Sequence, residues 1–127
     1  DMRNSMNQKN VFDSDLVLCC NSPMTGFYRD GFCNTGEEDY GLHHICCRVT
    51  NDFLVFSKSV GNDLSTPVPQ FNFPGLKDGD KWCICAHRWL EAYNNDCAPN
   101  VYLLSSNIKC LDIIPLNILK KFSVDLD

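Results

Sequence analysis

Four glycines recur every five residues, at positions 26, 31, 36 and 41, within the stretch of residues 25–47. At each glycine the backbone can take a positive φ or approach a ligand closely. The side chains between these glycines are of the kinds from which sites are built: Arg29, Asp30, Cys33, Glu37, Asp39 and His43. We therefore interpret residues 25–47 as a long functional loop, called the first loop below.

A second irregular stretch covers residues 62–80 and contains three prolines and two glycines. The prolines exclude a helix and argue against a central strand. An irregular stretch of this length is uncommon in a small domain and usually carries function. The alternative is a loop packed by its own Phe71, Phe73 and Leu76. This stretch is called the second loop below.

Short apolar runs and helical patterns alternate outside the two loops. Thr50 or Asn51 is a good helix N-cap, Gly61 is a typical helix stop, and Pro115 suits the start of a closing helix. We expect strands or extended segments at residues 16–20, 44–50, 81–86, 101–104 and 112–114, and helices at 51–60, 87–96 and from 115 onward. This order predicts an α+β fold, a single compact domain with a small mixed or antiparallel sheet, two to three helices and two long functional loops.

Length and charge limit the classes of protein. The 127 residues suit one domain, which we place at residues 11–127, after a polar, disordered lead-in at residues 1–10. A net charge of −5 with scattered basic residues disfavours nucleic acid as a partner. No apolar run approaches the roughly twenty residues that span a bilayer, so we expect no membrane partner. The sequence does not indicate an oligomeric state.

Nine cysteines are an unusual count for this length, and the count is odd. Two pairs, Cys19-Cys20 and Cys46-Cys47, are adjacent in sequence and cannot easily pair with each other. The sequence has no signal-peptide pattern. We therefore expect reduced thiols in a cytoplasmic protein, with an organelle matrix as the alternative compartment.

Cys33 and His43 form the candidate catalytic pair. A cysteine is reactive near neutral pH when a base or a positive field stabilises its thiolate, and His43 and Arg29 can supply these. The alternative is that Cys33 is a small buried apolar residue and that His43 is a hydrogen-bonded residue at the end of a strand.

A ligand pocket is predicted where the two loops meet, because polar groups of both signs on loops commonly form a recognition site. The predicted ligand-binding residues are Arg29, Asp30 and Asp39 from the first loop, Asn62, Asp63 and Thr66 from the second, and Arg88 beneath them. The sequence thus predicts a small-molecule-binding protein or a small enzyme with a loop-built polar pocket for a small polar ligand. For Arg29 the alternative is a structural salt bridge with a carboxylate.

Two other functions remain open. Four thiolates, from Cys33, Cys46, Cys83 and Cys85, would suit structural zinc, although Cys83 and Cys85 are closer in sequence than the usual zinc-binding pair. Apart from that site we expect no cofactor. The other alternative is a non-enzymatic protein-interaction module that docks a partner through an apolar patch around Phe71 and Phe73.

Four motifs run through nearly the whole chain: Thr25-Gly-Phe-Tyr-Arg-Asp-Gly-x-Cys33-x-Thr-Gly-x-x-Asp39-x-Gly-x-His43, Gly61-Asn-Asp-Leu-Ser-Thr-Pro67, Phe73-Pro-Gly-Leu-x-x-Gly-Asp80 and Trp82-Cys-x-Cys85-Ala-x-Arg88-Trp89. Together they resemble the small proteins grouped as domain-of-unknown-function family 2237, over residues 10–122. The resemblance implies a short stand-alone protein of bacteria and some eukaryotes with no assigned reaction. It also implies that five cysteines belong to the family's motifs, and that the chain departs from the family at Asn107, where members often have a histidine. Those cysteines are Cys19, Cys33, Cys46, Cys83 and Cys85.

Overall fold

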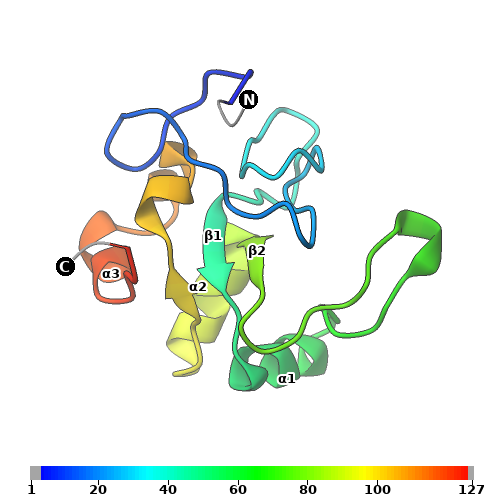
Figure 1. The fold of residues 1–127 in the computed structure, drawn as a ribbon. Coiled ribbons are helices and arrows are strands. Elements are labelled where there is room, and N and C mark those ends of the chain that lie inside the picture. The colour runs from blue at the N-terminus through cyan, green and yellow to red at the C-terminus, as the bar shows by residue number, and fades with distance from the viewer. Residues whose placement is uncertain (1–3, 126–127) are drawn as a thin grey trace.

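Three short antiparallel strands form the sheet, in the order β2–β1–β3 (Figure 1). The computed structural model describes residues 4–125. Strand β1 (Ile45–Arg48) pairs along its whole length with β2 (Lys81–Ile84) and more briefly with β3 (Asn100–Val101). The predicted α+β class is therefore confirmed, and the sheet is antiparallel.

The helices begin and end at the signals seen in the sequence. Helix α1 (Asn51–Ser59) follows Thr50, whose Oγ1 accepts a hydrogen bond from the Phe53 amide at 3.1 Å, and Gly61 beyond its end has φ +90°. Helix α2 (Ala86–Asn94) follows β2 directly, and α3 (Leu116–Lys120) follows Pro115. None of the helices in residues 4–125 is long and apolar enough to cross a membrane.

The main hydrophobic core lies on one face of the sheet, beneath the helices. Alternate residues of β1 and β2 point to this face, because successive side chains of a strand point to opposite sides. The larger residues of this core that come from the two strands and the three helices are Ile45, Cys47, Trp82, Ile84, Phe53, Trp89 and Leu119. The helical half of the domain is therefore held to the sheet by apolar packing.

The opposite face of the sheet carries a cluster of four buried cysteines, Cys19, Cys33, Cys46 and Cys83, called the sulfur cluster below. They form two disulfides, Cys19–Cys46 and Cys33–Cys83, with Cα atoms 5.7 and 5.5 Å apart. The prediction of reduced thiols is thus wrong for these four residues. Packing brings each strand cysteine against a loop cysteine, which the sequence spacing does not reveal.

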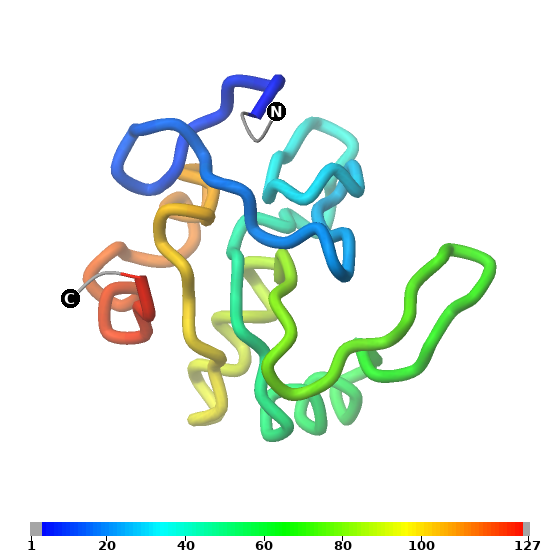
Figure 2. Tube along the Cα trace, viewed as in Figure 1, coloured from blue at the N-terminus to red at the C-terminus, as the bar shows by residue number. Residues whose placement is uncertain are grey.

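The two loops leave the sheet in different ways. The first loop folds over the sulfur cluster, whereas the second extends from the body as a long arm, seen at the right of Figures 1 and 2. A 3-10 turn, Pro69–Phe71, lies in this arm. The arm returns toward the body at Leu76, whose amide donates to the Leu64 carbonyl at 2.8 Å. The second loop therefore contacts the sheet region through its base and through Phe73, whose ring centroid lies 5.2 Å from that of Trp82 in β2.

Four segments differ from the sequence prediction. The strand expected at residues 101–104 is limited to β3 (Asn100–Val101), because Leu103–Ser105 form a 3-10 helix. The strand expected at residues 112–114 is wrong, because residues Ile108–Asp112 form a 3-10 helix that buries Cys110. Residues 16–20 are extended but not a strand, and the amides of Cys19 and Cys20 share the Gly31 carbonyl. In the predicted lead-in, residues 1–3 lie outside the described residues, while Asn10 is fully buried, so the folded part begins before residue 11.

Candidate functional site

A cavity of about 180 Å³ lies where the first loop, the base of the second loop and the start of α2 meet. We call it the Cys85 pocket. Its lining residues come from three of the four sequence motifs: Gly41, His43, Asn62, Leu64, Trp82, Cys83, Ile84, Cys85 and Arg88. The pocket is smaller than the roughly 300–1,000 Å³ of drug-sized ligand sites, so it suits a small molecule.

His43 is held in the pocket by a buried carboxylate. Its Nδ1 lies 2.6 Å from Oδ1 of Asp39, and its amide donates to Oδ2 of Asp39 at 2.9 Å. Asp39 is 1% exposed, and Thr35 donates a further hydrogen bond to Oδ2 at 3.0 Å. Since an ionised carboxylate only accepts, the neutral imidazole carries its proton on Nδ1 and keeps Nε2 as an acceptor.

Gly41 gives the imidazole the room it needs. A Cβ added at Gly41 would lie 2.7 Å from Cε1 of His43, which is closer than real Cβ atoms approach. The next residue, Leu42, has a positive φ of 53°, and its carbonyl accepts hydrogen bonds from the amides of His44 and Ala86. The loop backbone at His43 is thus tied directly to the first residue of α2.

Cys85 is the N-cap residue of α2 and carries a free, partly exposed thiol. The N-terminus of a helix favours negative charge, because its first amides are not used within the helix and its dipole is positive there. The side chain of Cys85 therefore lies where the helix favours negative charge. Cys85 and the imidazole of His43 line the same small cavity.

Arg88 and Asn62 supply polar groups for recognition. Nη1 of Arg88 donates to the Val60 carbonyl at 3.3 Å and to Oε1 of Glu91 at 3.1 Å, and the residue is partly exposed. These bonds fix the guanidinium at the pocket one helical turn from Cys85. Glu91 offsets the charge of Arg88, so the helix N-terminus and the guanidinium donors favour a polar ligand with hydrogen-bond acceptors.

The structure contradicts the prediction that Cys33 is the catalytic nucleophile. Cys33 is fully buried and bonded to Cys83, so it has no free thiol to act as a nucleophile beside His43. Cys85, which the sequence suggested only as a metal ligand, is the free cysteine in the cavity with His43. Its position between a strand and a helix was visible in the sequence and is the signal that could have identified it.

Four of the predicted ligand-binding residues have structural contacts instead. Arg29 lies over the Trp82 ring, 5.1 Å from its centroid, and its guanidinium donates to the Gly26 carbonyl. Asp30 accepts hydrogen bonds from the Phe32 amide and from Nδ2 of Asn34. Asp63 accepts from the amides of Ser65 and Thr66 and from Oγ1 of Thr66, which shapes an exposed turn. Of the predicted set, Asn62 and Arg88 line the pocket, and Asp39 reaches it through His43.

The sulfur cluster overlaps with the predicted metal ligands. Cys33, Cys46 and Cys83 belong to it, and Cys19 takes the place expected for Cys85. The Sγ atoms of Cys19, Cys33 and Cys46 all lie within 4.8 Å of one another. The arrangement brings together four sulfur atoms, but it holds them as two disulfides.

The comparisons with known proteins agree with the resemblance found in the motifs. The model of family DUF2237, described as an uncharacterized protein conserved in bacteria, matches residues 9–123. No curated protein matches the chain. The match covers both loops, the sheet and the Cys85 pocket.

Proposed function

From the geometry of the Cys85 pocket we propose that this protein, which belongs to the DUF2237 family, is a small enzyme that depends on a thiol for its reaction. Its substrate class would be a small, polar compound with a reactive carbonyl group. Cys85 would be the nucleophile, His43 the base, Asp39 the residue that orients the base, and Arg88 with Asn62 the recognition groups.

One observation carries the proposal: a free thiol at a helix N-terminus shares a small cavity with a histidine whose other ring nitrogen is held by a buried carboxylate. A nucleophile, a base and a group that orients the base are the parts that covalent catalysis requires. The nucleophile is distant in sequence from the other two residues, since Asp39 and His43 lie in the first loop and Cys85 follows β2.

The proposed reaction is acyl transfer to water. Nε2 of His43 takes the proton of the Cys85 thiol as the sulfur attacks the carbonyl carbon. The S–C bond forms, the bond from that carbon to the leaving group breaks, and the leaving group departs with the proton from His43. Water then attacks the acyl group with His43 as the base, the S–C bond breaks, and a carboxylic acid and the free thiol result.

Alkylation by iodoacetamide, followed by peptide mass spectrometry, tests the nucleophile. The thiolate sulfur forms a bond to the CH₂ carbon as iodide leaves. Cys20 and Cys97 are internal references, because both are also unpaired and partly exposed. We expect Cys85 to react about tenfold faster than either at neutral pH, and His43→Gln to remove most of this difference. Equal rates at the three thiols, or an unchanged rate in His43→Gln, would contradict the proposal.

A burst assay tests the acyl transfer. With p-nitrophenyl acetate in excess, we expect a rapid release of about one p-nitrophenolate per chain and an acetyl group on Cys85. Cys85→Ser should abolish the burst, while Cys20→Ser should keep it. A burst that survives in Cys85→Ser would place the chemistry elsewhere.

A second candidate function, a thiolate metal domain, is supported by the closeness of the four sulfur atoms. A phosphine reductant would supply two electrons to each disulfide, and zinc would then displace the protons of the four thiols. Elemental analysis after reduction, zinc addition and gel filtration without oxygen should give about one zinc per chain, lost in Cys46→Ser and kept in Cys85→Ser. Absence of bound zinc in the reduced chain would exclude this candidate.

A protein-interaction module has less support. Phe71 in the arm is 72% exposed, but Phe73 is partly buried and its ring centroid lies 5.2 Å from that of Trp82. A single exposed aromatic ring does not make an apolar patch of the size that usually marks a docking surface.

A further inference from the structure

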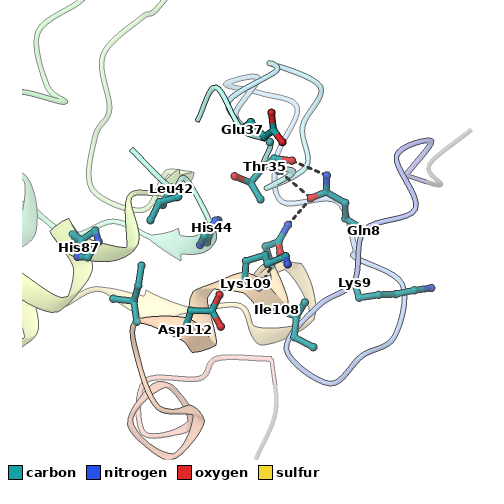
Figure 3. Close-up of a pocket in the computed structure, with 13 residues that line it drawn as sticks. Gln8, Lys9, Thr35, Glu37, Leu42, His44, His87, Ile108, Lys109 and Asp112 are labelled. Carbon is teal, nitrogen blue, oxygen red and sulfur yellow. Dashed lines mark hydrogen bonds between the residues drawn. The ribbon is translucent and has the colours of Figure 1, made fainter. Parts of the chain in front are cut away.

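The largest of the cavities described here, about 680 Å³, is lined by residues of the first loop, the N-terminal segment and the 3-10 helix at Ile108–Asp112 (Figure 3). We call it the His44 cavity. It has the size of a site for a drug-sized molecule. Leu42 and His44 line it, whereas Gly41 and His43 line the Cys85 pocket. Residues 41–44 therefore form a wall between the two cavities.

His44 is a buried polar group without a partner. The residue is 3% exposed, and neither ring nitrogen has a hydrogen-bond partner among the described residues. A buried donor or acceptor left without a partner typically costs about 1–3 kcal/mol, so native proteins rarely keep one without a reason. A ligand that offers the missing partner is such a reason.

Buried Asn107 and half-buried Gln8 and Thr35 in this cavity already bond to one another. Oε1 of Gln8 accepts from the Thr35 amide and from Nδ2 of Asn107, and Nε2 of Gln8 donates to the Thr35 carbonyl (Figure 3). Nδ2 of Asn107 also donates to the Cys33 carbonyl at 3.1 Å. Of the buried side-chain atoms in the described part of the chain, only the nitrogens of His44 are left without a partner.

The walls and the charges define the class of ligand. Leu42, Ile108 and Ile113 give the cavity apolar walls. Of the two lysines at its rim, Lys9 is paired with Asp15 at 2.7 Å. The positive charge of Lys109 is then outnumbered by the negative charges of Glu37 and Asp112, so the rim has no excess of positive charge. An anionic ligand is therefore disfavoured, and a mostly apolar, neutral one is favoured.

The ring nitrogens of His44 are covered from water, while the residue lines the cavity. A half turn of the imidazole about its Cβ–Cγ bond exchanges the positions of the nitrogens with those of the ring carbons. This motion breaks no hydrogen bond, because the nitrogens make none with the described residues. The imidazole can thus exchange the two arrangements, and offer either one to a ligand, without loss of an existing hydrogen bond.

We propose that the His44 cavity is a second binding site, distinct from the Cys85 pocket, for a neutral, mostly apolar small molecule that exchanges a hydrogen bond with the His44 imidazole. The ligand class follows from the apolar walls, the lack of excess positive charge at the rim and the unpartnered histidine. The site does not depend on Cys85 or on the reaction proposed for it.

NMR titration of the full chain with small probes tests this site. The chain has three histidines, so ¹⁵N-histidine labelling gives a simple spectrum that single variants can assign. Benzimidazole is the probe, because it is neutral and has both a donor and an acceptor. Indene has the same shape without nitrogen, and benzoate has a negative charge. We expect benzimidazole to shift the His44 ring nitrogens and to bind about tenfold more tightly than indene or benzoate.

Two phenylalanine variants separate the hydrogen bond from the cavity itself. His44→Phe should weaken benzimidazole binding about tenfold and leave indene binding unchanged. His87→Phe, a change at an exposed histidine on the same cavity, should leave both within about twofold. Thermal unfolding of both variants checks that they fold. Benzimidazole binding that is unchanged in His44→Phe, that shifts only His43, or that is absent would overturn the proposal.

Discussion

Cys46 and Cys83 lie opposite each other on neighbouring strands, yet each forms its disulfide with a cysteine outside the sheet. Their amides point away from each other, to Oγ of Ser106 and Oγ1 of Thr25. The two residues therefore form a non-hydrogen-bonded pair, the type in which side chains come closest. The disulfides connect Cys19 and Cys33, which lie outside the sheet, to the strands, and they do not connect the strands to each other.

Loss of one disulfide should destabilise the protein strongly. Cys19 and Cys46 are 27 residues apart, and the loss of such a cross-link costs about 3–4 kcal/mol in the chain-entropy account. We expect the double variant Cys19→Ala, Cys46→Ala to lose that much free energy of unfolding in urea, beyond the loss in a control. The control is Cys47→Ala, Cys110→Ala, which removes two buried thiols that form no disulfide. Equal losses in the two variants would mean that the cross-link contributes nothing.

Gly41→Ala should affect the reactivity of Cys85 through His43. The added methyl group would force the imidazole away from its place beside Asp39, because it would lie 2.7 Å from Cε1. We expect Cys85 alkylation to slow to nearly the rate of His43→Gln. The double variant Gly41→Ala, His43→Ala relieves the contact, so it should be more stable than the sum of the single changes by about 0.5 kcal/mol or more. Strict additivity would show that the two residues do not interact.

The pH dependence of stability should report on His44. Burial lowers the pKa of His44 from 6.5 to about 4, while Asp39 and Asp112 act to raise it and His43 and Lys109 act to lower it. Between these two pH values the unfolded chain binds a proton that the folded chain does not. The contribution of His44 to the free energy of unfolding is therefore fully present above the unfolded pKa of 6.5. It falls as the pH drops from 6.5 to about 4 and is constant below that, with a total loss of up to about 3 kcal/mol.

His44→Phe provides the control for that measurement. The variant has no imidazole at this position, so its free energy of unfolding should fall less steeply between pH 6.5 and about 4 than that of the original chain. The difference between the two urea-unfolding curves isolates His44 from the carboxylates, which titrate in both proteins. Parallel curves over this range would show that His44 takes up its proton equally in the folded and unfolded chains.

Asn107 should be intolerant of a change in its hydrogen-bonding groups. It is 1% exposed, its Nδ2 donates to Gln8 and to the Cys33 carbonyl, and its Oδ1 accepts from the Lys109 amide. Asn107→Asp keeps the shape but sets a carboxylate oxygen against two acceptors. We expect a loss of about 2 kcal/mol or more in urea unfolding at neutral pH. Asn51→Asp, at an exposed position, should stay within about 0.5 kcal/mol.

Local signals in the sequence predicted the regular elements well. Thr50 and Gly61 mark α1 because the cap hydrogen bond and the positive φ depend on neighbouring residues only. The strand predicted at residues 112–114 failed because a short apolar run before Pro115 does not distinguish a strand from a buried turn.

The candidate site was less predictable, because its parts meet only in the folded chain. Of the residues predicted from the sequence, His43, Asn62 and Arg88 line the Cys85 pocket, and Asp39 contacts His43. It could not tell that Cys33 is enclosed in a disulfide while Cys85 faces the cavity, since both are motif cysteines. The unpartnered nitrogens of His44 likewise depend on what packs around the ring, which no spacing of residues discloses.

The two faces of the sheet respond differently to their surroundings. Apolar packing holds the helices to one face of the sheet, and a reductant does not affect this packing. On the other face, disulfides that a reductant can break hold the first loop. Reduction of the two disulfides would leave the apolar packing of the helices in place and would loosen the attachment of the first loop, which carries His43. The redox conditions around the protein would then set how firmly its pocket is built.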